Sequence, residues 1–278
     1  MKDAGFSSRT HNAPTDEMPT LGSDVNNVKS PSDNQRFYDS IAHEYDRSYH
    51  SPSKYHDLHT AVETEFIISN MVPMGRTLEV GPGQGRFTQS LAENSTTVIA
   101  ADLSIKMLEI CKMRTKAKNV VYRQCDLFEL KDNDFGGFDT IVVMWVIPHL
   151  DDATLALRKL SSLLRPEGRL IFDLWNSASL RSYQLTQHNK RLKQAERDCV
   201  ADDNRGWAYT RYYTYDEMLL SLQRADLKVL SERGRCLLPT MVFPGRRLFF
   251  PLYRVLDALL QRPCKRHYYS RLFCCTPA

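Results

Sequence analysis

The stretch LEVGPGQGRF, from Leu78 to Phe87, places three glycines within five residues directly after a short apolar run. Glycine adopts backbone conformations that other residues avoid, and it has no Cβ to keep a ligand at a distance. A turn of this kind between a strand and a helix exposes backbone N–H groups at the helix N-terminus, where anionic groups bind. The stretch therefore predicts a nucleotide-like ligand held over residues 81–85.

The sequence on either side of the glycines alternates between strand-like and helix-like patterns. Apolar runs that are typical of buried strands lie near residues 76–80, 97–101, 119–123, 138–145 and 168–174. Helical patterns lie between most of them, at residues 86–93, 104–113 and 151–164, and a helix that starts at Thr214 and a late strand at 227–236 follow. Strand and helix in succession predict an α/β fold, with a parallel sheet covered by helices on both faces.

Two classes of cofactor fit a glycine turn in such a fold. The dinucleotide pattern needs a third small residue at position 86, which is arginine here, because the third glycine comes one residue earlier. The carboxylate of Glu79 would repel a pyrophosphate but favour a ligand that carries positive charge. S-adenosylmethionine (SAM) has an ammonium and a sulfonium group, whereas Asp102 suits the ribose hydroxyls of either cofactor. The residues favour SAM, and a dinucleotide stays the weaker alternative.

Five motifs in the same order strengthen this choice: LEVGPGQGRFTQSLAE, VIAADLSIKMLEICKMR, VVYRQCDLFEL, FDTIVVMWVIPHL and LRPEGRLIFDLWN. Their order and spacing resemble those of the class I SAM-dependent methyltransferases, over roughly residues 36–175 and more loosely over 207–236. The resemblance implies a Rossmann-like fold with a mostly parallel seven-stranded sheet and helices on both faces. It also implies SAM as the cofactor.

The resemblance assigns cofactor-binding roles to individual positions. Glu79 would hold the amino group of the methionine moiety, and Gly81, Gly83 and Gly85 would let the backbone approach the cofactor. Acidic and apolar residues after the next two strands would contact the ribose and adenine: Asp102, Leu103, Asp126 and Leu127. A tyrosine of the N-terminal helix, Tyr38 or Tyr45, would close over the cofactor.

Several of these positions also have an ordinary structural interpretation. Tyr38 and Tyr45 could pack their helix against the body of the protein, and Asp126 could be a plain loop residue. His149, after the fourth strand, is the candidate general base for an acceptor proton, or else a histidine bonded to a carbonyl group. Tryptophans of the same region, Trp145 and Trp175, are expected in the core.

The chain divides into three parts by composition. Residues 1–33 are polar and predicted to be disordered, and residues 34–240 form the methyltransferase domain, with 176–213 as an insertion on the acceptor side. Residues 241–278 are a basic aromatic segment with seven basic residues against one acidic residue. This segment is interpreted either as a helix that packs on the domain or as a peripheral contact with an anionic membrane surface.

Composition excludes several classes of protein. The longest uncharged apolar run is too short to span a bilayer, and seven cysteines without a C-x-x-C pair argue against a disulfide framework or a zinc site. No metal site is expected, since no cluster of His, Asp and Glu appears at ligand spacing. No nucleic-acid partner is expected, since the body of the chain is slightly acidic. The sequence predicts a cytoplasmic enzyme that methylates a small molecule, with oxygen as the favoured atom. The alternatives are a methyltransferase for a membrane lipid or lipid-linked sugar and a catalytically silent SAM-binding protein.

Overall fold

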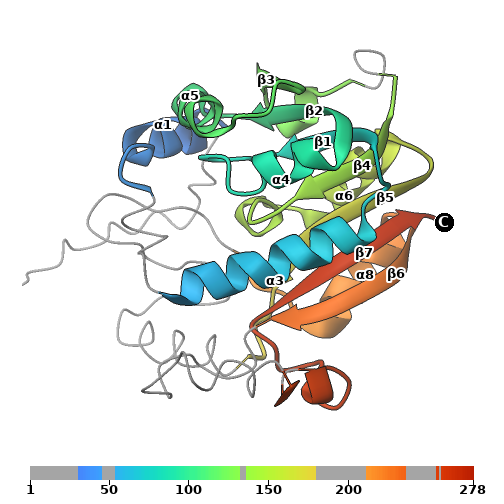
Figure 1. The fold of residues 1–278 in the computed structure, drawn as a ribbon. Coiled ribbons are helices and arrows are strands. Elements are labelled where there is room, and N and C mark those ends of the chain that lie inside the picture. Colours follow the sequence, from blue (N-terminus) through green and yellow to red (C-terminus); the bar gives the residue numbers. More distant parts are fainter. Residues whose placement is uncertain (1–30, 46–53, 132–135, 180–210, 236–254, 257) are drawn as a thin grey trace, which may run out of the picture.

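The computed structural model describes residues 31–45, 54–131, 136–179, 211–235, 255–256 and 258–278. Seven strands form one sheet in the order β3-β2-β1-β4-β5-β7-β6, and all pairs are parallel except those made by β7 (Figure 1). The strands are β1 (Gly75–Val80), β2 (Ser95–Asp102), β3 (Val120–Gln124), β4 (Phe138–Val143), β5 (Leu164–Trp175), β6 (Leu227–Arg235) and β7 (Ser270–Pro277). The expected mostly parallel, seven-stranded sheet is confirmed.

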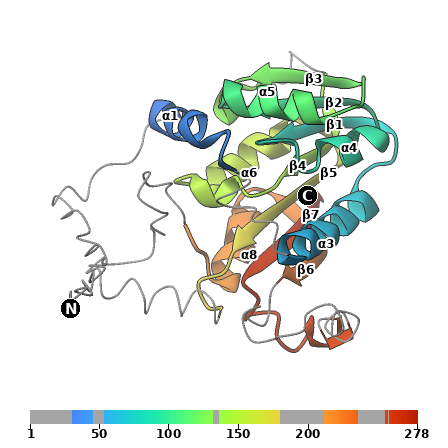
Figure 2. The ribbon, with the colours of Figure 1, turned by 60° about the vertical axis from the view of Figure 1, so that its left-hand side comes forward.

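Helices cover both faces of this sheet, as expected. They are α1 (Pro31–Ile41), α3 (Lys54–Asn70), α4 (Thr88–Glu93), α5 (Ile105–Arg114), α6 (Ala153–Ser162) and α8 (Tyr215–Arg224). Apolar residues of α3 and α4 pack on one face of the sheet, and those of α6 and α8 pack on the other. Figures 1 and 2 show α1 beside α5, away from the β7–β6 edge along which α3 lies.

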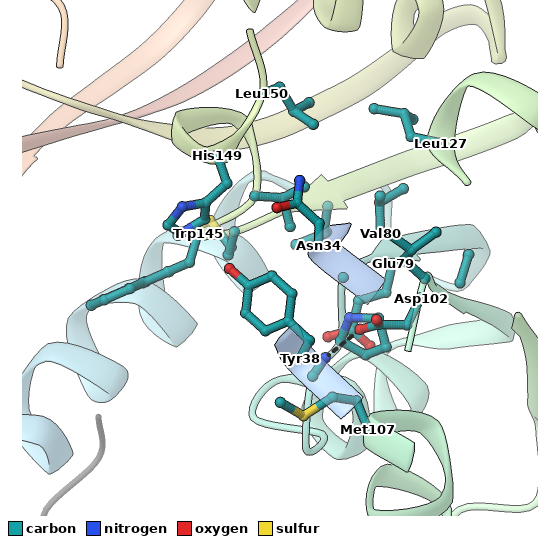
Figure 3. A pocket seen from close by; sticks show the side chains of 18 of the residues that line it. Asn34, Tyr38, Glu79, Val80, Asp102, Met107, Leu127, Trp145, His149 and Leu150 are labelled. Atoms are coloured by element: carbon teal, nitrogen blue, oxygen red, sulfur yellow. Dashed lines mark hydrogen bonds between the residues drawn. The ribbon is translucent and has the colours of Figure 1, made fainter. Parts of the chain in front are cut away.

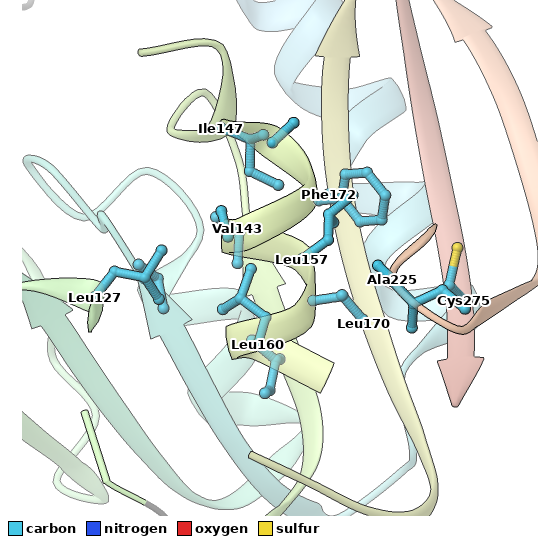
Figure 4. Packing of buried hydrophobic residues seen from close by; sticks show 14 of the residues in the cluster. Leu127, Val143, Ile147, Leu157, Leu160, Leu170, Phe172, Ala225 and Cys275 are labelled. Atoms are coloured by element: carbon cyan, nitrogen blue, oxygen red, sulfur yellow. The ribbon is translucent and has the colours of Figure 1, made fainter. Parts of the chain in front are cut away.

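The face under α6 and α8 carries the larger apolar cluster (Figure 4). Alternate residues of the central strands, such as Val143 and Phe172, meet Leu157 and Leu160 of α6 there, and all four are fully buried. Because strand side chains alternate between faces, Val142 and Ile171 of the same strands belong to the cluster on the opposite face. This two-sided burial explains the near-continuous apolar runs that predicted the strands.

The order of the strands indicates where in the sheet a ligand would bind. Parallel strands β1 and β4 are neighbours, but the chain turns from β1 towards β2 on one side and later returns to β4 on the other. Ligands of open α/β sheets bind at the carboxyl ends of the strands, at such a point of reversal. The turn 81–85 and Asp102 follow β1 and β2 at this edge.

The sheet does not end at residue 240, where the sequence analysis placed the end of the domain. Residues 270–277 form β7, which pairs antiparallel with both β5 and β6. The side chains of residues 270–275 are buried because β7 lies inside the sheet, and even Arg271 is only 2% exposed, with Nη2 3.1 Å from Glu232 Oε2. The end of the basic segment is thus part of the domain, because β7 joins β6 to the rest of the described sheet.

Smaller differences concern element boundaries. Helix α1 begins at Pro31, three residues before the expected boundary, whereas the disorder predicted for residues 1–30 lies outside the described residues. Helix α4 begins at Thr88 and not at residue 86, because Gly85 has φ +88°, which a helix does not accommodate. Of the expected insertion 176–213, only the ends are described, and a parallel bridge joins Asn176 to Tyr213. Among the described residues, no helix is long and apolar enough to cross a bilayer.

Candidate active site

The glycine turn leaves β1 in backbone conformations that favour glycine. Gly81, Gly83 and Gly85 have φ of +68°, +54° and +88°. The N–H of Gly81 donates to the Ala101 carbonyl of β2 at 2.8 Å, and the N–H of Gly85 donates to the Pro82 carbonyl at 2.9 Å. These bonds fix both ends of the turn at the carboxyl edge of the sheet.

The limited space around the turn is a second reason for glycine at positions 81 and 85. A Cβ on Gly81 would lie 2.3 Å from Cγ2 of Val146, and one on Gly85 would lie 3.0 Å from Sγ of Cys111. A Cβ on Gly83 would meet nothing within 4 Å. The backbone of Gly83 therefore faces open space, which is where a ligand can approach it closely.

Asp102 ends β2 and ties the turn to the next loop. Its Oδ2 accepts the Gly83 N–H at 3.0 Å, and its Oδ1 accepts the Ser104 N–H at 2.8 Å. Burial raises the pKa of Asp102 to about 6, although both of these hydrogen bonds act in the opposite direction. A carboxylate with this environment gains from a ligand that donates hydrogen bonds to it, as ribose hydroxyls do.

Glu79 lies almost completely buried near the end of β1. Its Oε2 accepts a hydrogen bond from the Thr88 hydroxyl at 2.7 Å. Burial raises its pKa to about 7, the Thr88 bond opposes this, and the negative charge of Asp102 adds to it. Two neighbouring buried carboxyl groups with raised pKa values mark a site where a positively charged ligand is favoured.

A cavity of about 770 Å³ joins these groups. Every residue that the sequence analysis assigned to the site lines it: Tyr38, Tyr45, Glu79, Gly81, Gly83, Gly85, Asp102, Leu103, Asp126, Leu127 and His149. Figure 3 shows Tyr38 between Asp102 on one side and Trp145 with His149 on the other. The structure thus brings together all of the expected site residues, whose individual roles stay proposals.

The two interpretations of Tyr38 and Tyr45 do not exclude each other. Phe37 and Ile41 of α1 are buried against α5, and the two tyrosines pack at the border of this cluster while they also line the cavity. Asp126 likewise has a structural role, since it accepts the Phe128 N–H at 2.8 Å and caps the short helix η1 (Leu127–Glu129). It lines the cavity as well.

His149 ends a short 3-10 helix, η3 (Ile147–His149), that follows β4. Its backbone N–H donates to the Val146 carbonyl at 2.8 Å. The imidazole lies against the rings of Tyr38 and Trp175, with centroid separations of 6.3 Å and 5.6 Å. The side chain thus lies among aromatic rings at the wall of the cavity (Figure 3).

A buried charged cluster beside the cavity was not predicted. Glu63 of α3 accepts hydrogen bonds from Arg86 and from the indole N–H of Trp145, the latter at 3.0 Å, and also pairs with Arg235. Asp173 of β5 accepts the Trp145 backbone N–H at 2.7 Å, and burial raises its pKa to about 6. These contacts place Trp145, which was expected in the core, on the cavity wall with φ +63°.

Burial lowers the pKa of Arg86 to about 10, so its guanidinium stays charged at neutral pH. The sequence contained one signal for this residue, namely an arginine where the dinucleotide pattern has a small residue. Nothing in the spacing pointed to its partner Glu63, because the two are 23 residues apart and come from separate helical patterns.

Comparisons with known proteins agree with this architecture. Residues 78–172 match the family model described as a methyltransferase domain. A ubiquinone biosynthesis O-methyltransferase of Xanthomonas axonopodis pv. citri is 30% identical over 118 residues, which cover 41% of this chain and 49% of the relative. A protein of the same name from Coxiella burnetii is 27% identical over 118 residues, with 41% and 50% covered. The chain spans about half the length of the curated relatives it matches.

Solved structures share the fold over most of the chain. Magnesium protoporphyrin IX methyltransferase (ChlM) of Synechocystis PCC 6803 with bound SAH has a TM-score of 0.61 at 14% identity, with 90% of this chain and all of that chain covered. A DhpI-SAM-HEP complex has a TM-score of 0.58 at 17% identity, with 88% and 96% covered. Residues 78–172 therefore resemble a methyltransferase domain, and the chain shares the fold of solved methyltransferases, which is the fold class that the five motifs predicted.

Proposed function

We propose that the protein is a SAM-dependent methyltransferase that methylates an oxygen atom of a small-molecule acceptor. One observation carries the proposal: a cavity of about 770 Å³ holds the glycine turn, the two buried carboxyl groups of Glu79 and Asp102, and the imidazole of His149. This volume suits a cofactor together with a small acceptor. Oxygen is favoured because the relatives with matching sequence are named as O-methyltransferases.

The groups of the cavity fit SAM better than a dinucleotide. Glu79 would hold the ammonium group and Asp102 the ribose hydroxyls, while the backbone of Gly83 faces open space for close approach. Leu103, Asp126 and Leu127 would contact the adenine from the next loops, and Tyr38 or Tyr45 would cover the cofactor from α1. A pyrophosphate in the same place would meet two carboxylates and be repelled.

The protein's own groups account for the remaining steps. When bound, SAM supplies a methyl group carried on a positively charged sulfur, and the rest of the cofactor is the leaving group, a neutral thioether. The cavity walls orient the acceptor, and such positioning contributes on the order of 7–11 kcal/mol to catalysis. His149 takes the proton of the acceptor hydroxyl, which contributes about a hundredfold to ten-thousandfold in rate. Small molecules are favoured as acceptors because the catalytic groups line an internal cavity.

Two alternatives are distinguished by the same measurements. A membrane lipid as acceptor would give the basic aromatic segment a role, but Tyr268, Tyr269 and Arg271 of that segment are buried in the domain. A catalytically silent protein would keep the cofactor site and lack turnover. Localisation in the cytoplasm, with or without contact with a membrane surface, belongs to the same proposal.

The deciding experiment combines cofactor binding with transfer of label. Calorimetry should show that S-adenosylhomocysteine (SAH) binds and that NAD does not. The protein is then incubated with methyl-labelled SAM and a cell lysate, and the label is followed into aqueous, organic, protein and nucleic-acid fractions. We expect aqueous label that depends on the protein. Organic label would favour the lipid acceptor, and label in protein or nucleic acid would contradict the proposal. SAH binding without transfer would favour the silent protein.

A further inference from the structure

Six neighbouring side chains form a ring beside one part of the cavity, and five successive pairs of them lie at ring-contact or cation–π distances. Five of them line the cavity directly, and the sixth, Trp175, supports them from the core. In order around the ring they are Tyr38, His149, Trp175, Trp145, Arg86 and Tyr45.

The aromatic members lie at contact distances. Centroid separations are 6.5 Å from Tyr45 to Tyr38, 6.3 Å from Tyr38 to His149, 5.6 Å from His149 to Trp175 and 5.6 Å from Trp175 to Trp145, all with steep interplanar angles. Rings at such angles present both faces and edges to the enclosed space. A planar aromatic ligand finds favourable edge-to-face and offset partners in a space of this kind.

Arg86 lies next to Trp145 and supplies the positive charge of the ring. Its guanidinium carbon lies 5.1 Å from the centroid of the Trp145 ring, and the phenol of Tyr45 acts on it electrostatically. In the described part of the chain, its Nε donates to the Thr60 hydroxyl at 3.0 Å and its Nη2 to Glu63. These bonds aim the guanidinium and leave Nη1 for a ligand.

The carboxylates near Arg86 are shared with other hydrogen-bond donors. Glu63 is shared between the two guanidinium groups of Arg86 and Arg235. The second carboxylate of the cluster, Asp173, is bound by the backbone N–H of Trp145 at 2.7 Å and the indole N–H of Trp175 at 3.0 Å. Its contact with Arg235 is long, at 3.9 Å. Glu63 thus binds Arg86 through Nη2, and Asp173, which is hydrogen-bonded to other donors, acts on Arg86 only through its charge.

We propose that this ring selects a planar aromatic acceptor that carries a carboxylate, with the aromatic ring among the side chains and the carboxylate on Arg86. This inference rests on the proposed function and names the substrate class of the same site. A guanidinium matches a carboxylate in geometry and charge. Cationic acceptors such as amines are disfavoured, because they would be placed beside Arg86.

Three ligands with the same diol test the charge preference: 3,4-dihydroxybenzoate, catechol and dopamine, which are anionic, neutral and cationic. Each is titrated by calorimetry into the full chain, with and without saturating SAH. We expect 3,4-dihydroxybenzoate to bind about ten- to a hundredfold more tightly than catechol, the ratio given by one charge-assisted hydrogen bond, and dopamine to bind most weakly. Equal affinities, or no binding of any of the three, would overturn the proposal.

Variants assign the preference to one residue. Arg86→Gln should lower the affinity for 3,4-dihydroxybenzoate to that for catechol and leave the affinity for catechol unchanged. Arg86→Lys should retain part of the preference for the carboxylate. The matched control is Arg165→Gln, which removes a partly exposed arginine paired with Asp139 at the start of β4. An equal loss for both ligands in Arg86→Gln would reduce Arg86 to a structural role and contradict the assignment.

The design separates this proposal from the proposed function. Failure of SAH to bind would count against the proposed function alone, since the ligand preference is also measured without SAH. SAH binding without a carboxylate preference would count against this inference alone. If both Arg86 variants fail to fold, the ranking of the three ligands on the unaltered protein still decides it.

Discussion

The carboxylate of Asp102 accepts the backbone N–H of Gly83 at 3.0 Å, which connects the end of β2 to the middle of the glycine turn. The same carboxylate accepts the Ser104 N–H, so one side chain organises two loops at the carboxyl edge of the sheet. The group proposed to bind the ribose therefore also shapes the turn that faces the cofactor. Substitutions at this position should report on both roles.

Asp102→Asn should weaken SAH binding by about ten- to a hundredfold, because it removes charge-assisted hydrogen bonds worth roughly 1.5–3 kcal/mol. Asparagine keeps one acceptor oxygen for the turn, so the fold should persist, which thermal unfolding checks. Asp139→Asn is the matched control, since Asp139 accepts the Arg76 N–H at the opposite end of the sheet. Equal SAH affinity in both variants would contradict the role of Asp102.

SAH affinity should fall as pH falls. The pKa values of Glu79 and Asp102 are raised to about 7 and about 6, and the ligand is expected to bind both groups as carboxylates. Below these values the free protein must first release protons, so the affinity should drop about tenfold between pH 8 and pH 6 and more steeply below. Calorimetry at several pH values measures this.

The control for this pH dependence is Glu79→Gln. Its amide oxygen can still accept the Thr88 hydroxyl, so the local structure should persist. SAH should bind more weakly at pH 8, and the change near pH 7 should disappear while the one near pH 6 remains. Affinity that is constant from pH 8 to pH 6 in the unaltered protein would show that neither carboxyl group faces the ligand.

Gly81→Ala should be much more destabilising than Gly83→Ala. Both changes place a side chain at positive φ, which costs about 1–2 kcal/mol. Only the first also forces a Cβ to within 2.3 Å of Val146, and such overpacking costs about 1–3 kcal/mol more. Chemical denaturation measures the difference in the free energy of unfolding.

Val146→Ala in the Gly81→Ala background tests the cause of that difference. It should recover the contribution of the clash and leave the backbone strain. Similar losses for both glycine variants would mean that the closeness of Val146 is not what requires glycine at position 81.

His149→Asn should lower kcat by about a hundredfold to ten-thousandfold and leave the Kd of SAH unchanged, because the imidazole is proposed to act on the acceptor proton and not on the cofactor. The measurement is steady-state turnover on an acceptor identified from the labelled fractions. Partial recovery of the rate at higher pH would identify the lost group as a base. A kcat within threefold of the unaltered protein would assign His149 to packing among the rings.

The parallel part of the fold was predictable because the patterns that specify it lie within short stretches of the sequence. Each strand from β1 to β5 lies next to its turn or helix in the sequence, and burial on both faces gives continuous apolar runs. The glycine turn with Glu79 and Asp102 belongs to this part, which explains why the sequence could place these residues together at one edge of the sheet.

The missed features depend on distant contacts. Strand β7 contains a buried arginine and pairs with β5 about a hundred residues earlier in the chain. The pairs of Arg86 and Arg235 with Glu63 join residues 23 and 172 positions apart. No periodic pattern in the sequence carries such information. The ring of side chains around Arg86 and its positive charge could therefore be found only in the structure.

The position of β7 between β5 and β6 affects how the protein is made. Strand β5 is complete at residue 175, but its antiparallel neighbour emerges from the ribosome about a hundred residues later. At 5–20 residues per second, the nascent chain carries an open, apolar sheet edge for about 5–20 s. Unpaired edges of this kind recruit other chains. The yield of active protein should therefore depend on chaperones or slow, cool expression more than its final stability would suggest.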